Sequence, residues 1–337
     1  MVQRSFDASS QHRLSAGIFL LYLGADCEQA CLFCALKSYQ PPVDGGDVEL
    51  AELLRRAGEA RGAGIDHVQF EGIDPPRFSR ILALTEGVTA LGFSHLTVTG
   101  TARRFADSAF VEEFFARAPP STVVVAPLYG VTPAVHDAVT RQVGSFVEVR
   151  AAIENLKAVR GGGCLALTTV PTPVNVGELA QVLEFGASMG VSVRGRLPYP
   201  LRRAGIEAYQ SAAIRETDLI QSFAESLPNV ARRYRTRVAK TFTDMLQHPC
   251  ALYRVADRRG NSTLRPSGSD QWRLEGADGP SKAVDTVPCP HVASCDLATR
   301  CPGLHYEAYA ERFGLAEFFP VPPTGVLRRL FRPITAR

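Results

Sequence analysis

Between residues 17 and 199 the chain alternates six times between short apolar segments and longer segments with helical spacing. The apolar segments are 17–24, 67–72, 95–100, 121–130, 164–170 and 191–199. Most are nearly continuous in apolar residues, as strands are when both of their faces are buried. The intervening segments repeat their apolar residues every three or four positions, as amphipathic helices do. The alternation therefore predicts an α/β fold with a parallel sheet, and it leaves open a partial barrel or an open doubly wound sheet.

After Pro200 the alternation stops, which predicts a second part of the chain. We expect a flexible lead-in over 1–14, the sheet over 15–205 and a separate domain with a tail over 206–337. Residues 201–230 have helical spacing, and a short helix is expected after residue 301. Residues 232–240 alternate arginines with Tyr, Thr and Val, which predicts a strand with one basic face. That face is either solvated or, with Arg202 and Arg203, binds a phosphate or an acidic peptide.

Composition excludes several classes of protein. The chain has 337 residues, 45% of them hydrophobic, and a net charge of +3, which is too small for a dedicated nucleic-acid binder. The longest apolar run, residues 16–25, is too short to cross a bilayer. Cleavage of this run as a signal peptide before Cys27 would destroy a cysteine cluster. We therefore expect a cytoplasmic protein that binds neither membranes nor nucleic acid.

The eight cysteines fall into groups. Cys27, Cys31 and Cys34 form a C-x3-C-x2-C triplet in the loop after the first predicted strand, with Phe33 just before the last cysteine. Clustered thiols in a chain with ample core indicate metal binding rather than disulfides. Three thiolates are one short of a fully ligated 4Fe–4S cluster, so the triplet predicts a cluster with one open iron. The alternatives are a zinc site completed by a distant ligand and a coincidental spacing of the thiols.

These motifs resemble those of the radical S-adenosylmethionine (SAM) superfamily. The segment "CEQACLFC" matches its CxxxCxφC signature, where φ is aromatic. "FEGIDPP" (70–76) is similar to the family's GGEP motif, with Ile73 in place of the second glycine and Asp74 in place of glutamate. "TTVPTPVN" (168–175) resembles its fifth strand, and 126–156 its fourth-strand segment, which passes the ribose. "VTGTARR" (98–104) matches its third-strand motif only weakly.

The resemblance implies a fold, cofactors and a reaction. The fold is a partial (β/α)6 TIM-type barrel with a C-terminal iron–sulfur extension. Cys27, Cys31 and Cys34 would bind a 4Fe–4S cluster, and Phe33, Gly72, Asp74 and Asn175 would bind SAM. A one-electron reductant of the flavodoxin or ferredoxin type would supply the electron that cleaves SAM. The resulting 5′-deoxyadenosyl radical would abstract a hydrogen atom from the substrate.

The second cysteine group lies in the C-terminal part of the chain. It contains Cys289, Cys295 and Cys301 at C-x5-C-x5-C spacing, with Cys250 39 residues earlier. It resembles the SPASM and twitch extensions of the family, which implies an auxiliary 4Fe–4S cluster. Four ligands would restrict this cluster to electron transfer, whereas three would let it bind substrate. A zinc site or unligated thiols are the alternatives, and His291 is expected at the surface.

The lone Cys164 opens the fifth predicted strand. It is interpreted either as a small buried hydrophobe or as a catalytic hydrogen-atom donor that quenches a substrate radical. His136 and Asp137 are interpreted as fixing a turn.

Three functions fit the motifs. The first is maturation of a ribosomally made peptide by cross-linking, oxidation or epimerisation, with a separate peptide-recognition protein as partner. The second is tailoring of a sugar, nucleoside or other small natural product. The third is a non-catalytic iron–sulfur or zinc scaffold or redox sensor, which would need neither an open iron nor a carboxylate at Asp74.

Overall fold

The computed structural model describes most of the chain. The described residues are 13–15, 17–23, 27–34, 50–72, 74, 76, 78–159, 163–198, 206–246, 248, 250, 286–295 and 304–320. The chain divides into two compact units. The first comprises Met1–Ala30, Gln40–Pro127 and Gln142–Leu167, and the second Cys31–Tyr39, Leu128–Arg141 and Thr168–Arg337. Our expected boundary at 205–206 stays a prediction.

The first unit is built on strands β1 to β5. Strand β1 (Arg13–Ser15) pairs antiparallel with β2 (Ile18–Tyr22), and the sequence pattern did not predict it. Strands β3 (His67–Glu71), β4 (His95–Thr99) and β5 (Ser121–Pro127) follow β2 in parallel. Their registers bring the first residues of successive strands together: Ile18 pairs with His67, His67 with His95, and His95 with Ser121. The loops that follow these strands therefore leave from one edge of the sheet.

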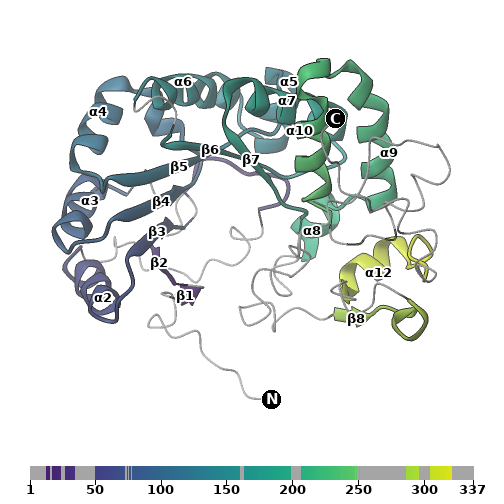
Figure 1. Ribbon diagram of the computed structural model, residues 1–337, viewed down its shortest axis with the longest axis horizontal. Coiled ribbons are helices and arrows are strands. Elements are labelled where there is room, and N and C mark those ends of the chain that lie inside the picture. Colours follow the sequence, from purple (N-terminus) through teal and green to yellow (C-terminus); the bar gives the residue numbers. More distant parts are fainter. Residues whose placement is uncertain are drawn as a thin grey trace. The chain divides into compact units, whose positions relative to one another are not determined.

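Helices accompany these strands in the same unit (Figure 1). They are α2 (Leu50–Gly62), α3 (Ile81–Ala90), α4 (Ser108–Arg117) and α6 (Ser145–Ala158). Each buries one apolar stripe, as Leu53, Ala57 and Ala60 do in α2. Helix α4 starts where the Asp107 side chain accepts hydrogen bonds from the Ala109 and Phe110 amides, an N-cap. The apolar spacing in the sequence predicted all four helices.

The second unit contains the end of β6 (Leu165–Thr169), strand β7 (Ser192–Gly195) and most of the remaining helices. Its main core joins α7 (Leu179–Met189), α9 (Glu216–Ser226) and α10 (Arg232–Thr243), and the Phe223 and Phe242 rings stack 3.7 Å apart. The other elements are α5 (Pro133–Thr140), α8 (Ile206–Ala212), the antiparallel pair β8 (Thr286–Pro288) and β9 (Leu304–Tyr306), and α12 (Glu307–Phe313).

The sheet order is β1-β2-β3-β4-β5-β6-β7, with six parallel strands from β2 to β7. The α/β fold class with six parallel strands is therefore confirmed. Consecutive strands are neighbours in space, as in a chain that winds in one direction through successive strand–helix units. No helix in the described part of the chain is both long enough and apolar enough to span a bilayer.

One element was predicted wrongly. Residues 232–240 belong to helix α10, not to a strand. The sequence alternation from Arg233 to Val238 fits a strand, but a helix buries Val238, Ala239 and Phe242 on one face. Arginine, lysine and alanine are also good helix formers. Burial of this short apolar stripe against α7 outweighs the strand-like alternation. The helices expected between 201 and 230 and after residue 301 are confirmed by α8, α9 and α12.

Candidate active site

The cysteine triplet follows β2, the first of the parallel strands. Cys27, Cys31 and Cys34 are all half-buried, and the Cys34 amide donates a hydrogen bond of 2.9 Å to the Cys31 carbonyl. This bond closes a turn that holds the second half of the loop. Within the described ranges, no three His, Cys, Asp or Glu side chains gather closely enough to hold a metal ion. The donor set, three thiols within eight residues, nevertheless fits an iron–sulfur cluster.

Asp74 lies two residues beyond Gly72, in the loop after β3. Gly72 has a φ of 138°, a conformation that favours glycine. Only 8% of Asp74 is exposed, and Thr101, in the loop after β4, holds its carboxylate. The Thr101 amide lies 3.2 Å from Oδ1, and its hydroxyl lies 3.0 and 3.1 Å from the two carboxylate oxygens. The side chain that the resemblance assigns to SAM therefore has a fixed orientation at the carboxyl edge of the first unit.

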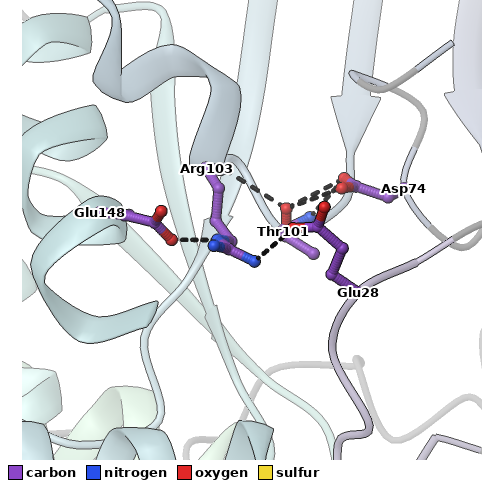
Figure 2. A network of polar contacts seen from close by, with 5 residues as sticks. All are labelled: Glu28, Asp74, Thr101, Arg103 and Glu148. Carbon is purple, nitrogen blue, oxygen red and sulfur yellow. Dashed lines mark hydrogen bonds and ion pairs between the residues drawn. The ribbon is translucent and has the colours of Figure 1, made fainter. Parts of the chain in front are cut away.

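Arg103 connects this region to the loop that carries the cysteine triplet (residues 27–34, the cysteine loop) through a contact within the first unit. Its Nη1 lies 3.0 Å from Oε2 of Glu28, the residue directly after Cys27, and its Nε donates to Glu148 of α6. Figure 2 shows Arg103 between the two glutamates, with Thr101 and Asp74 beside them. The hydrogen bond that Arg103 donates to Glu148 raises the pKa of its guanidinium, and the Arg103 side chain is only 17% exposed. The guanidinium thus stays charged and bound to two carboxylates, one from the cysteine loop and one from helix α6.

In the second unit, aromatic contacts hold the other half of the cysteine loop. The Leu32 amide donates to the Val139 carbonyl at 2.9 Å, and the Phe33 ring meets the Tyr129 ring edge-on at 5.1 Å. Tyr129 stacks in turn on His136, whose Nδ1 accepts the Tyr129 amide at 3.2 Å. Burial lowers the pKa of His136 to about 4, so the imidazole is neutral at pH 7. His136 fixes the segment after β5, in agreement with its interpretation as a turn residue.

Two further loops of the second unit are held by single side chains. Asn175, 2% exposed, accepts the Thr172 amide at 2.7 Å and donates to the Val170 carbonyl at 3.0 Å, which closes the loop after β6. Glu178 binds the loop after β5: its Oε2 accepts the Val131 and Thr132 amides at 2.7 and 3.2 Å, and its Oε1 accepts the Thr132 hydroxyl at 2.6 Å. Asn175 therefore has a structural role in its own loop, and its contact with SAM stays a prediction.

Cys164 lies at the amino end of β6, whereas the loops described above leave the carboxyl ends of the strands. The thiol is 1% exposed and donates to the carbonyls of Leu156 and Val159 at the end of α6, at 3.1 and 3.4 Å. This geometry favours the small buried hydrophobe. The hydrogen-atom donor stays an untested hypothesis.

The second cysteine group is partly assembled in the second unit. Cys250 is buried in a cluster with Tyr209, Tyr309 and Phe318, and Cys295 packs against the same cluster. Cys289 is half-buried, and its carbonyl accepts the Val292 amide at 3.3 Å, just before Cys295. Cys301 lies outside the described residues. Two cysteines 45 positions apart in the sequence thus pack in one hydrophobic cluster of side chains.

A buried polar network adjoins this cysteine group. His248 Nδ1 lies 2.9 Å from Glu216 Oε1, and both side chains are less than 10% exposed. Tyr309 donates to Glu317, which also accepts the Thr217 amide at 3.0 Å. Burial raises the pKa of the Tyr309 hydroxyl, which therefore stays protonated. The network joins α9, α12 and the segment that leads to Cys250.

Sequence reasoning missed several residues of the site. Thr101, Arg103, Glu28 and Glu148 form its polar contacts in the first unit, and Glu178 holds a loop in the second. Two signals could have pointed to Thr101 and Arg103: the weak motif match at 98–104, and their position just after a predicted strand, since carboxyl ends of strands carry sites in α/β folds.

Comparisons with known proteins were made by sequence and by structure. No family model matches the chain, and no curated protein does. Among solved structures, Streptococcus suis SuiB bound to the precursor peptide SuiA aligns with a TM-score of 0.49 and 16% identity, over 64% of this chain and 46% of that chain. The alignment thus spans less than half of SuiB.

Two further solved structures were compared. TYW1 with a bound lysine–pyruvate adduct aligns with a TM-score of 0.40 and 12% identity, over 63% of this chain and 73% of that one. The FeFe-hydrogenase maturase HydG from Carboxydothermus hydrogenoformans aligns with a TM-score of 0.35 and 12% identity, over 74% of this chain and 78% of that one.

Proposed function

We propose that this chain is a radical SAM enzyme. The observation that carries the proposal is the position of the CxxxCxφC triplet, in the loop directly after the first of six parallel strands. Active sites of α/β proteins form at the carboxyl ends of such strands. Cys27, Cys31 and Cys34 would supply three thiolates to a 4Fe–4S cluster and leave one iron for SAM.

Asp74 is the residue of this chain best suited to bind the amino group of SAM. It follows β3 at the carboxyl edge, and Thr101 orients its carboxylate through three contacts of 3.0–3.2 Å. A carboxylate has about four acceptor sites, so this contact with Thr101 leaves capacity for an ammonium group. The side chain is one methylene shorter than the glutamate of the family motif, and Thr101 restricts where that shorter side chain points.

The cluster, when bound and reduced, would supply the electron that cleaves SAM to methionine and a 5′-deoxyadenosyl radical. The protein's part is to hold the thiolates, to orient the SAM amine through Asp74 and to keep the loops around the cofactor ordered. A flavodoxin or ferredoxin would deliver the electron. The cytoplasm, where thiols stay reduced, suits such a site.

The second cysteine group supports an auxiliary 4Fe–4S cluster as part of the same proposal. Cys250 lies in a buried hydrophobic cluster against which Cys295 packs, and Cys289 and Cys301 would complete a set of four thiolates. Such an extension suits maturation of a ribosomally made peptide, with tailoring of a small natural product as the alternative. The substrate supplies the hydrogen atom, so deuterium from the correct substrate would appear in 5′-deoxyadenosine.

The first test is reductive cleavage of SAM. The protein is reconstituted anaerobically with iron and sulfide, mixed with SAM and dithionite, and assayed for 5′-deoxyadenosine. We expect the wild type to release it and Cys31→Ala to lose this activity by at least about a hundredfold, because the cluster loses one of three ligands. Cys164→Ala, which changes a thiol outside both groups, is the matched control and should retain activity.

A wild-type protein that binds iron but releases no 5′-deoxyadenosine would support the non-catalytic scaffold instead. Binding of zinc without iron would exclude the cluster. The peptide and small-molecule alternatives separate in a pull-down from a native extract, because a peptide-modifying enzyme should retain a leader sequence or a recognition protein.

A further inference from the structure

We infer that Arg103 is a positioning residue that holds the start of the cysteine loop through Glu28. The inference rests on the proposed function, because the loop matters to the reaction only if Cys27 binds the cluster. Glu28 is covalently next to Cys27, and Arg103 lies 75 residues later, at the start of the 3-10 helix Arg103–Ala106 that follows β4. Their side chains meet at 3.0 Å, within the first unit (Figure 2).

The backbone just before Arg103 is held in a defined conformation. Ala102 has a φ of 59°, a left-handed conformation that costs a non-glycine residue energy and persists only where its surroundings enforce it. The residue before Ala102, Thr101, binds Asp74, and the Arg103 amide lies 3.4 Å from the Thr101 hydroxyl. The direction in which the Arg103 side chain leaves the chain is therefore set before it meets a carboxylate.

The guanidinium has a second anchor in α6. Its Nε donates to Glu148, while its Nη1 contacts Glu28. An Arg fork can bind two carboxylates at once, which a lysine ammonium does with less directional control. Arg103 therefore links the cysteine loop to a helix that is itself packed on β5.

The positive charge of Arg103 attracts the carboxylates around it. Glu28, Glu148 and Asp74 all act on the Arg103 guanidinium and raise its pKa. Loss of the Arg103 charge would remove this attraction from all three carboxylates, and their mutual repulsion would then push the exposed one, Glu28, outward. Glu28 is 53% exposed, so we expect this single ion pair to have a modest effect.

The test uses the metal-free full-length protein, so that it does not depend on the cluster. Amide hydrogen exchange of a peptide covering 27–34 is followed by mass spectrometry. We expect Arg103→Gln and Glu28→Gln each to raise the exchange rate of this peptide by about threefold, and Arg103→Lys to raise it less. The double variant should exchange no faster than Arg103→Gln alone, because both changes remove one contact.

Arg117→Gln is the matched control. Arg117 lies in the same unit, at the end of α4, and pairs with Glu113 at 3.1 Å, away from the cysteine loop. Exchange over 27–34 should not change in this variant. Unchanged exchange in both Arg103→Gln and Glu28→Gln, or additive effects in the double variant, would overturn the inference.

A second readout connects the contact with the cluster. In reconstituted protein, a ferrous chelator should remove iron faster from Arg103→Gln than from the wild type or Arg117→Gln. If no variant, the wild type included, binds a cluster while exchange still responds to Arg103, the proposed function fails and the loop contact stands. Equal rates of iron removal alongside faster exchange would confine Arg103 to the metal-free loop and overturn its role in the site.

Discussion

At the scale of single residues, the site depends on side chains that hold other side chains. Asp74 is fixed by Thr101, and the start of the cysteine loop is bound by Arg103 through Glu28. In the second unit His136 holds Tyr129 by stacking and by accepting its amide. Thr101 holds a carboxylate that we propose to bind SAM, whereas Arg103 and His136 hold neighbours of the cysteine loop and of the segment after β5.

His136 predicts a pH dependence of stability. Its folded-state pKa is about 4 against 6.5 for an ordinary histidine, because burial disfavours the charged ring. The unfolded chain therefore takes up a proton that the folded chain excludes. The contribution of neutral His136 to the free energy of unfolding is complete above pH 6.5. It is lost as the pH drops towards 4, by roughly 3 kcal/mol in total.

The measurement is urea unfolding of the metal-free protein at several pH values from 7.5 to 4.5. His136→Asn keeps an acceptor for the Tyr129 amide but cannot titrate, so the difference in unfolding free energy between wild type and variant should shrink as the pH falls. A constant difference across this range would show that His136 is not the group responsible.

At the scale of elements, the loop after β5 shows how one carboxylate organises a segment that has no regular structure. Glu178 lies in the short 3-10 helix Val176–Glu178, which follows β6, and accepts three hydrogen bonds from Val131 and Thr132. An added Cβ on Gly130 would lie 2.8 Å from the Glu178 carboxylate, so a glycine is needed for this close approach. The two loops are therefore held together within the second unit.

Glu178→Ala should lower the free energy of unfolding by about 2 kcal/mol, because two backbone amides lose a charged acceptor. Glu178→Gln keeps one carbonyl oxygen and should cost roughly half as much. The matched control is Glu184→Gln, which changes a carboxylate that accepts a single amide, from Ala231, at 2.8 Å. Equal unfolding midpoints for Glu178→Ala and the wild type would contradict this role.

At the scale of the whole molecule, the two cysteine groups are separate in sequence and have different supports. The first lies in a loop after β2, and the second combines Cys250, in the cluster with Tyr309, with Cys289 and Cys295 near β8. Each group therefore has its own local scaffold. Loss of one group should leave the other able to bind iron.

Iron content tests this independence. After anaerobic reconstitution, we expect about eight irons per chain in the wild type and about four in either Cys31→Ala or Cys250→Ala, because each variant loses one cluster. Cys164→Ala should keep the wild-type content. A Cys250→Ala protein with unchanged iron would show that the second group holds no cluster, and loss of all iron in either variant would show that the groups are coupled.

The sequence by itself determined the fold class and the position of the first cysteine group. Strand–helix alternation is local, because a buried strand and an amphipathic helix each leave their period in consecutive residues. Six predicted strands became β2 to β7, and the triplet lies in the loop after β2 as expected. Strand β1 was not predicted, and residues 232–240 were predicted wrongly, because a short segment with few apolar residues fits both periods.

Only the tertiary structure decided which distant residues meet. Arg103 and Glu28 are 75 positions apart, and Cys250 and Cys295 are 45 apart, so no spacing in the sequence predicts either contact. Such pairs form because neighbouring parallel strands bring their following loops to one edge, and because a buried apolar cluster collects side chains from any part of the chain. The hydrophobic period of a strand or helix can be read from consecutive residues, whereas charge pairing and burial depend on the folded arrangement as a whole.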